Sequence, residues 1–273
     1  MRDMKIGMTM KRDLIFRLVM MSLILCSVFA GRAAVNDADS VRVLWIGNSY
    51  TFFNDLPAMV KNIAETNGVK MACTEVLKGG ERLKGHLENP RLIELLKKGG
   101  WDYVVVQENS SLPAYDTDFV RREVYPYAQT IDSLAHAGTP DVKVVYYMTW
   151  GHKYGNIRPR ENYPLCDTFE GMQERLKTSY LEMTYQNDAV CAPAGMAWAA
   201  VRKERPDIIL YNQDTFHPAV AGTYLNAVTI YTTMYPRHFQ TDFNAGLPPA
   251  EAEFLQQVGQ NIVLDNLRLL NIR

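Results

Sequence analysis

Three polar residues, far apart in the chain, have the types and the spacing that acyl transfer requires. Ser49 follows Gly47 and Asn48 at the carboxyl end of an apolar run, and Asp214 precedes His217 by three positions. A serine hydroxyl becomes a nucleophile when a histidine takes its proton and a carboxylate orients that histidine. If the fold brings Ser49 to His217, the three residues form a triad. Each part also has a structural interpretation, because Gly-Asn-Ser is common in turns and Asp214 could cap a helix.

The apolar runs of the chain predict a sheet whose edge can hold these residues. Short apolar segments read as strands and alternate with helical segments, which implies a parallel sheet covered on both faces. No internal repeat or shift in composition marks a second domain, so we predict one three-layer α/β/α domain over residues 38–273. The five expected strands cover residues 41–47, 69–77, 101–107, 142–150 and 189–195.

Between the strands, periodicity and capping residues predict the helices. Asn54 and Asp55 are expected to cap a helix that stops at Gly68, and Pro90 is expected to divide the next helical stretch into two pieces. Further single helices are predicted over residues 118–138, 169–186, 218–235 and 249–270.

In a parallel sheet, ligands bind beyond the carboxyl ends of the strands, so chemistry is expected in the segments that follow them. Gly79 and Gly80 follow the second strand and can bring backbone N–H groups close to a ligand. Asn109 follows the third strand with a side-chain amide. Neutral donors of this kind stabilise the oxyanion of a tetrahedral intermediate. His152 follows the fourth strand and is expected to line the same cleft.

In this order, the segments resemble the four sequence blocks of the SGNH (GDSL-like) hydrolase superfamily. The Gly-Asp-Ser block reads Gly-Asn-Ser at 47–49, and the glycine of the second block falls at 79–80. The Gly-x-Asn-Asp block reads Gln-Glu-Asn-Ser at 107–110, and the Asp-x-x-His block is intact at 214–217. The chain is most similar to a bacterial, often exported subgroup that has Gly-Asn-Ser and a Gln-Glu pair after the third strand. The substituted positions lie outside the triad.

The resemblance implies a flavodoxin-like fold and a role for each matching residue. Ser49 is the implied nucleophile, His217 its base and Asp214 the orienting carboxylate. The N–H groups of Ser49 and Gly80, together with the side chain of Asn109, are the implied oxyanion hole. Enzymes of this superfamily need no metal, so neither a metal nor another cofactor is expected. Further contacts to the substrate are expected from Asn48, Tyr50, Gly79, Glu108, Trp150 and His152.

Residues 1–34 have the pattern of a secretory signal peptide. Basic residues precede an apolar stretch over residues 14–30, which only Arg17 interrupts as a charge, and mostly small residues follow at 31–34. We expect cleavage near residues 30–34, export to the periplasm or the medium, and no stable membrane insertion afterwards. A retained membrane anchor is the alternative, although the uncharged run is short for a span.

Charge and cysteine content narrow the possible partners and the redox state. The chain has 29 Lys and Arg against 30 Asp and Glu, and this balance disfavours nucleic acid as a partner. After cleavage Cys73, Cys166 and Cys191 remain, without the spacing of a metal site. Free thiols are expected, although one disulfide is possible in an exported protein.

The residues and the resemblance together predict a secreted serine esterase, with O-deacetylation of carbohydrate as its expected reaction. The substrate would be a small-molecule or polysaccharide ester. Two alternatives stay open, namely a lipase- or thioesterase-type acyl hydrolase on the same triad and a non-catalytic carbohydrate-binding protein on a degenerate hydrolase fold. The carbohydrate prediction depends on the signal peptide and on aromatic side chains that could stack on sugar rings, at Tyr50, Phe52, Phe53, Trp150 and Tyr154.

Overall fold

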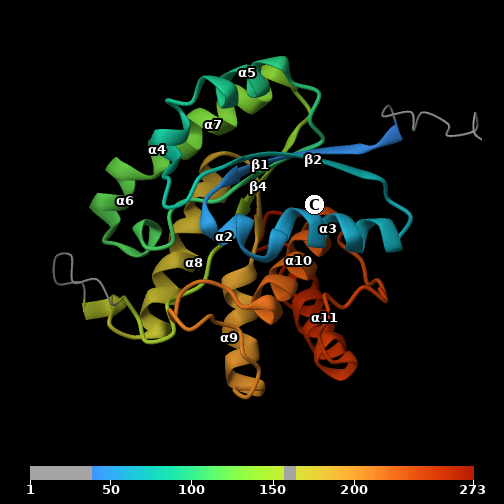
Figure 1. Ribbon diagram of the computed structural model, residues 1–273. Helices are drawn as coiled ribbons and strands as arrows, with labels where there is room; N and C mark the ends of the chain where they lie inside the picture. Colours follow the sequence, from blue (N-terminus) through green and yellow to red (C-terminus); the bar gives the residue numbers. More distant parts are fainter. Residues whose placement is uncertain (1–38, 157–163) are drawn as a thin grey trace, which may run out of the picture. The chain divides into compact units, whose positions relative to one another are not determined.

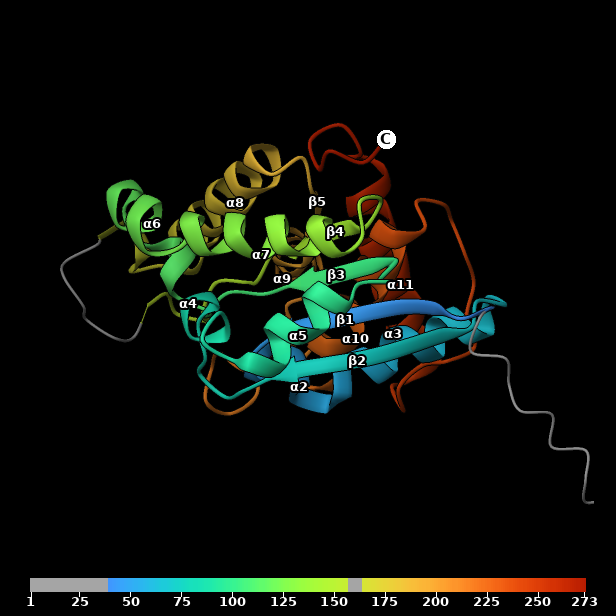
Figure 2. The same ribbon diagram turned by 90° about the horizontal axis from the view of Figure 1, so that it is seen from above.

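The computed structural model describes residues 39–156 and 164–273, whose strands form a five-stranded parallel sheet (Figures 1 and 2). The predicted signal peptide lies outside the described residues. The strand order β2-β1-β3-β4-β5 is the flavodoxin-like order, so the predicted fold class is confirmed. The strands are β1 (Val41–Gly47), β2 (Met71–Leu77), β3 (Tyr103–Val106), β4 (Lys143–Tyr147) and β5 (Val190–Ala192).

Alternating side chains of the central strands supply two separate cores. In β1, Val43 and Trp45 face one layer of helices, whereas Leu44 and Ile46 face the other. The first layer consists of α3 (Leu56–Thr66), α9 (Ala194–Glu204), α10 (Val220–Met234) and α11 (Pro249–Leu264). The second consists of α4 (Leu83–His86), α5 (Pro90–Lys98), α6 (Thr117–Glu123), α7 (Tyr125–Gly138) and α8 (Phe169–Gln186).

Short helical turns occupy several of the connections. The four-residue helix α2 (Ser49–Phe52) lies directly after β1. The 3-10 turns are η2 (Phe53–Asp55), η3 (Leu112–Ala114) and η4 (Pro164–Cys166).

The register of the strands brings their carboxyl ends to one edge of the sheet. Gly47 at the end of β1 pairs with Leu77 of β2, and Ile46 pairs with Val106 of β3. The segments that follow these three strands therefore leave the sheet side by side. They contain Ser49, the Gly79-Gly80 pair and Asn109, as the sequence predicted.

Three details differ from the predicted helices. The last helix, α11, ends at Leu264, whereas it was predicted to reach residue 270. The helix predicted over residues 118–138 is divided at Val124, because Pro126 has no N–H to continue the helical ladder and is tolerated only in a first turn. The helix α9 was not predicted, because its small residues after Pro193 read as a continuation of the fifth strand. That strand ends at Ala192, and the helix begins two residues later.

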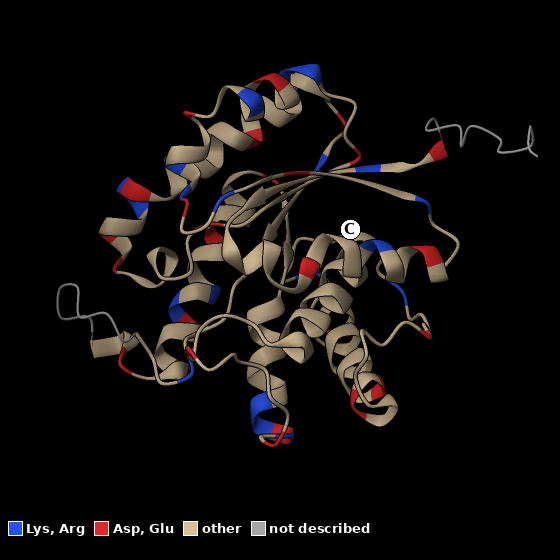
Figure 3. Ribbon diagram, in the orientation of Figure 1, with Lys and Arg blue, Asp and Glu red and all other residues tan. Residues whose placement is uncertain are grey.

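The described residues from Val41 to Arg273 form one compact unit, and the predicted start of the domain near residue 38 stays a prediction. Acidic and basic residues are interspersed over the outer helices (Figure 3). Within the described ranges, no helix combines the length and the apolar character that crossing a bilayer requires. As expected, the three cysteines among the described residues are free thiols: Cys166 and Cys191 are buried and Cys73 is half-buried.

Candidate active site

Ser49 lies at the start of α2, in a turn that buried side chains hold in place. Oδ1 of Asn48 accepts a hydrogen bond from the N–H of Tyr50 (3.1 Å) and caps the helix. Oε1 of Gln107 accepts two more, from the N–H of Asn48 and from Oγ1 of Thr51, both at 2.9 Å. A Cβ at Gly47 would come within 2.7 Å of that Gln107 oxygen, so this close approach requires glycine.

Ser49, His217 and Asp214 form one hydrogen-bonded chain. The distance from Nε2 of His217 to Oγ of Ser49 is 2.8 Å, and that from Nδ1 to Oδ2 of Asp214 is 2.7 Å. Oδ1 of Asp214 accepts from the N–H groups of Phe216 (3.1 Å) and His217 (2.9 Å). Burial raises the pKa of this carboxyl, but the His217 side chain and the two N–H donors outweigh burial and lower the pKa from 3.8. Asp214 is therefore suited to orient the imidazole as a carboxylate.

The turn that carries Asp214 and His217 is fixed at several points. Thr215 has a φ of 72°, a left-handed conformation that a β-branched residue adopts only when its surroundings impose it. Its carbonyl accepts from the N–H of Lys153 (2.9 Å), and the carbonyl of His217 accepts from the N–H of Asn212 (2.9 Å). This backbone is thus held in the one conformation that points His217 toward Ser49.

Aromatic rings pack against the imidazole of His217, and further rings stack behind them. Phe53 stacks on His217 with centroids 4.2 Å apart and planes 3° apart, and Tyr50 approaches with its edge toward the ring. Tyr50 stacks in turn on Trp150 (4.5 Å), which stacks on Trp198 (4.2 Å). Since these rings are rigid and close-packed, they restrict the rotation of His217.

The three predicted oxyanion donors line one cavity beside His217. Asn109 accepts from the N–H of Ser111 through Oδ1 (3.2 Å), which leaves its Nδ2 as a donor. Gly80 has a φ of +68°, and no atom lies within 4 Å of where its Cβ would be. Ser49 opens a helix, so its N–H has no partner within that helix. The cavity holds about 180 Å³ and is lined by Asn48, Ser49, Tyr50, Gly80, Asn109, Ser110, Ser111, His152, Phe216 and His217.

The structure separates the residues predicted to contact substrate into two groups. Asn48, Tyr50 and His152 line the cavity. Glu108 and Trp150 do not: Glu108 is 1% exposed and accepts from backbone N–H groups, and Trp150 is fully buried with its Nε1 donating to the carbonyl of Phe216 (3.0 Å). We reinterpret both as supports of the site. Gly79 is exposed beside the ring of Phe52, outside the lining.

Sequence reasoning missed four residues of this region. Ser110, Ser111 and Phe216 line the cavity, and their adjacency to Asn109 and His217 was the available signal. Gln107 was read only as a departure from the third block, yet it holds the turn of Ser49. Within the described ranges, no group of three or more His, Cys, Asp and Glu side chains is placed to hold a metal ion.

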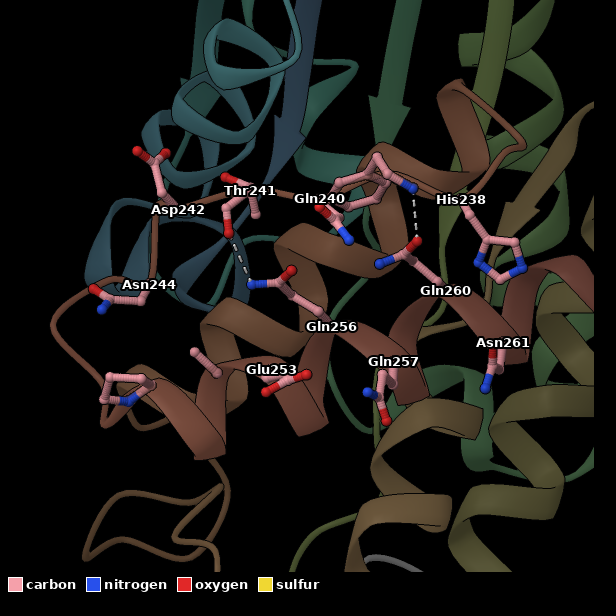
Figure 4. Close-up of a pocket in the computed structure, with 13 residues that line it drawn as sticks. His238, Gln240, Thr241, Asp242, Asn244, Glu253, Gln256, Gln257, Gln260 and Asn261 are labelled. Atoms are coloured by element: carbon pink, nitrogen blue, oxygen red, sulfur yellow. Dashed lines mark hydrogen bonds between the residues drawn. The ribbon is translucent and has the colours of Figure 1, made fainter.

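A larger cavity of about 810 Å³ lies between residues 238–244 and the outer side of α11 (Figure 4). Its lining is rich in side-chain amides, two of which are engaged in fixing the loop. Oε1 of Gln260 accepts from the N–H of Phe239 (2.9 Å), and Gln256 donates to the carbonyl of Thr241 (3.3 Å). The lining has no serine or cysteine, so we locate the candidate chemistry in the smaller cavity.

Comparison with known proteins places this fold in a class. No family model and no curated protein matches the chain. A solved structure from Slackia heliotrinireducens, provisionally assigned to the SGNH hydrolases, is 27% identical with a TM-score of 0.58, over 71% of this chain and 99% of that one. A DUF4886 family protein from Bacteroides uniformis is 18% identical with a TM-score of 0.67, over 83% and 95% of the two chains.

A variant of an acetyl xylan esterase from Geobacillus stearothermophilus is also 18% identical, with a TM-score of 0.51 over 73% of this chain and 97% of that one. The chain therefore has the fold of the SGNH (GDSL-like) hydrolases, and the resemblance seen in its four sequence blocks is confirmed. Its placement in a Gly-Asn-Ser subgroup stays a prediction.

Proposed function

We propose that this protein is an esterase in which Ser49 is the nucleophile, His217 the base and Asp214 the orienting carboxylate. The observation that carries the proposal is the unbroken hydrogen-bonded chain from Asp214 through His217 to Ser49, at 2.7 and 2.8 Å. This chain ends at a cavity into which Gly80 and Asn109 also face. The likeness to hydrolases of the SGNH class supports ester hydrolysis as the reaction.

In the acylation step, Oγ of Ser49 attacks the ester carbonyl carbon while Nε2 of His217 takes the hydroxyl proton. The carbonyl oxygen becomes an oxyanion and accepts hydrogen bonds from the N–H groups of Ser49 and Gly80 and from Nδ2 of Asn109. Collapse of the intermediate breaks the bond to the alcohol, which leaves with the proton of His217. Water, deprotonated by His217, then attacks the acyl-enzyme, and the acid is released with Ser49 restored.

A short acyl group on a carbohydrate is the substrate that we favour. The cavity of about 180 Å³ suits an acetyl group better than a long chain. Among the aromatic residues predicted to contact sugar, Phe52 and Tyr154 are 41% and 63% exposed, so their rings are available for stacking. Export through the predicted signal peptide remains part of this proposal, since it would bring the enzyme to extracellular polysaccharide.

An acyl-chain series separates this proposal from a lipase or thioesterase. We expect kcat/KM to fall by roughly 100-fold or more from p-nitrophenyl acetate to the octanoate. Each methylene that the small pocket cannot accommodate costs about 1–3 kcal/mol of transition-state binding, and the cost stops growing once the rest of the chain extends into solvent. Initial rates at matched concentrations below micelle formation provide the measurement. A rise in kcat/KM with chain length would contradict deacetylation and favour the lipase alternative.

Labelling with a fluorophosphonate tests the proposed chemistry directly. We expect the probe to form a covalent bond to Oγ of Ser49, located by mass spectrometry of the digested protein. Heat-unfolded protein is the control, because unfolding separates Ser49 from His217. Failure to label Ser49, combined with glycan binding and no ester turnover, would instead favour the non-catalytic carbohydrate-binding alternative.

A further inference from the structure

We propose that Glu108 is a positioning residue whose carboxylate joins the two loops of the oxyanion hole, so that the donors are held correctly only while Glu108 is ionised. The inference rests on the proposed function, because it concerns the same oxyanion hole. Glu108 itself does not line the cavity and touches no substrate.

The carboxylate of Glu108 bridges two segments that lie 25 positions apart. Its oxygens accept from the N–H of Leu83, at 3.2 Å to Oε1 and 3.4 Å to Oε2. Oε1 also accepts from the N–H of Asn109 at 2.5 Å. Leu83 is the first residue of α4 and directly follows the loop that contains Gly80, whereas Asn109 carries the side-chain donor. One buried group thus fixes the loop of each donor relative to the other.

The same loop is also tied to the turn of the nucleophile. Nδ2 of Asn48 donates to the carbonyl of Glu81 (3.0 Å), and the carbonyl of Gly47 accepts from the N–H of Lys78 (3.2 Å). These contacts flank Gly80 and place it relative to Ser49, whereas the contact at Leu83 places the loop, through Glu108, relative to Asn109. Loss of the Glu108 attachment would leave Gly80 placed relative to Ser49 but not relative to Asn109.

The surroundings of Glu108 determine when its carboxyl ionises. Burial is the main cause that raises its pKa, to about 7, and it outweighs the hydrogen bonds from Asn109 and Leu83 that lower it. The charged neighbours come from the loop before α4, where Arg82 lowers the pKa and Glu81 raises it. From α8, the buried hydroxyl of Tyr180 lies close to Glu108.

Protonation would convert one of the accepting oxygens of Glu108 into a hydroxyl donor. The main hydrogen bonds from the N–H groups of Leu83 and Asn109 both end on Oε1, so protonation of Oε2 would remove the negative charge that strengthens them and would set a hydroxyl against the N–H of Leu83. As the pH falls through about 7, we therefore expect the oxyanion hole to loosen and kcat to fall more than KM rises.

The pH profile of Glu108→Gln tests this role, with Glu88→Gln as a matched control. Both changes remove one carboxylate, but Glu88 is exposed and does not line the cavity. For the wild type and Glu88→Gln, kcat should fall by about tenfold more between pH 8 and pH 6 than it does for Glu108→Gln, because only the first two proteins lose a carboxylate at position 108 on protonation. Glu108→Gln should lack this extra acid loss and have a kcat roughly tenfold lower at pH 8. Identical limbs in all three proteins would overturn the proposal.

Backbone amide NMR gives a second readout that does not depend on turnover or on a folded variant. In the wild type, the amide shifts of Leu83 and Asn109 should titrate together near pH 7, and the same titration is expected in Ser49→Ala. If the amides titrate but no ester is hydrolysed, the bridging role of Glu108 holds and the proposed function fails. If esters are hydrolysed but the two amides do not respond to pH, the bridging role is wrong and the proposed function stands.

Discussion

Alanine at position 49 is expected to lower kcat/KM for p-nitrophenyl acetate by roughly 10⁴- to 10⁶-fold, because the reaction then has no oxygen to acylate. Oγ of Ser49 is the atom that His217 contacts at 2.8 Å. The remaining oxyanion donors and bound water would support only a small residual rate. Stopped or continuous release of p-nitrophenol measures the change, and the variant should also fail to react with a fluorophosphonate.

Ser111→Ala is the matched control for this variant. Ser111 lines the same cavity, but its contact with Asn109 is made through its backbone N–H, which alanine retains. We expect at most about a tenfold loss for Ser111→Ala, the size of effect that a single cavity-lining contact has. Both variants should keep the melting temperature of the wild type. Full activity in Ser49→Ala would show that another residue is the nucleophile.

The fold was predictable because its strands carry their own signal. The residues of β1, β3 and β4 are mostly apolar and short enough to exclude buried helices, and the turns between elements contain glycine, proline and capping residues. The prediction missed α9, where the local signals for a strand and for a helix are similar. The small residues after Ala192 fit either a strand or a helix, and only packing against α10 and α8 decides for α9.

The contact of Ser49, His217 and Asp214 was predictable because sequence order and strand topology place these residues at one edge of the sheet. The direction in which individual side chains point could not be predicted from the sequence. Trp150 and His152 both lie shortly after β4, but Trp150 stacks on Trp198 away from the cavity, whereas His152 lines the cavity. Glu108 likewise precedes Asn109, yet it points inward to backbone N–H groups. A buried polar residue must find partners, but its sequence position does not say which.

Removal of the base is the second change with a very large expected effect. We expect His217→Ala to reduce kcat/KM by roughly 10⁴- to 10⁶-fold, about as much as Ser49→Ala, because the nucleophile then keeps its proton. The double variant should be no worse than either single variant, since the two side chains act as one unit. A p-nitrophenyl acetate assay of all three proteins checks both statements. Additive losses in the double variant would mean that Ser49 and His217 act separately.

Asp214→Asn should have a smaller effect than loss of either partner, of about 10²- to 10³-fold in kcat/KM. The asparagine oxygen can still accept from the N–H groups of Phe216 and His217, so the turn should survive. Its amide would face Nδ1 of His217 and favour the wrong tautomer. Because the Asp214 side chain is 37% exposed, water can partly replace the lost carboxylate, which moderates the effect. A loss equal to that of His217→Ala would show that Asp214 does more than orient the imidazole.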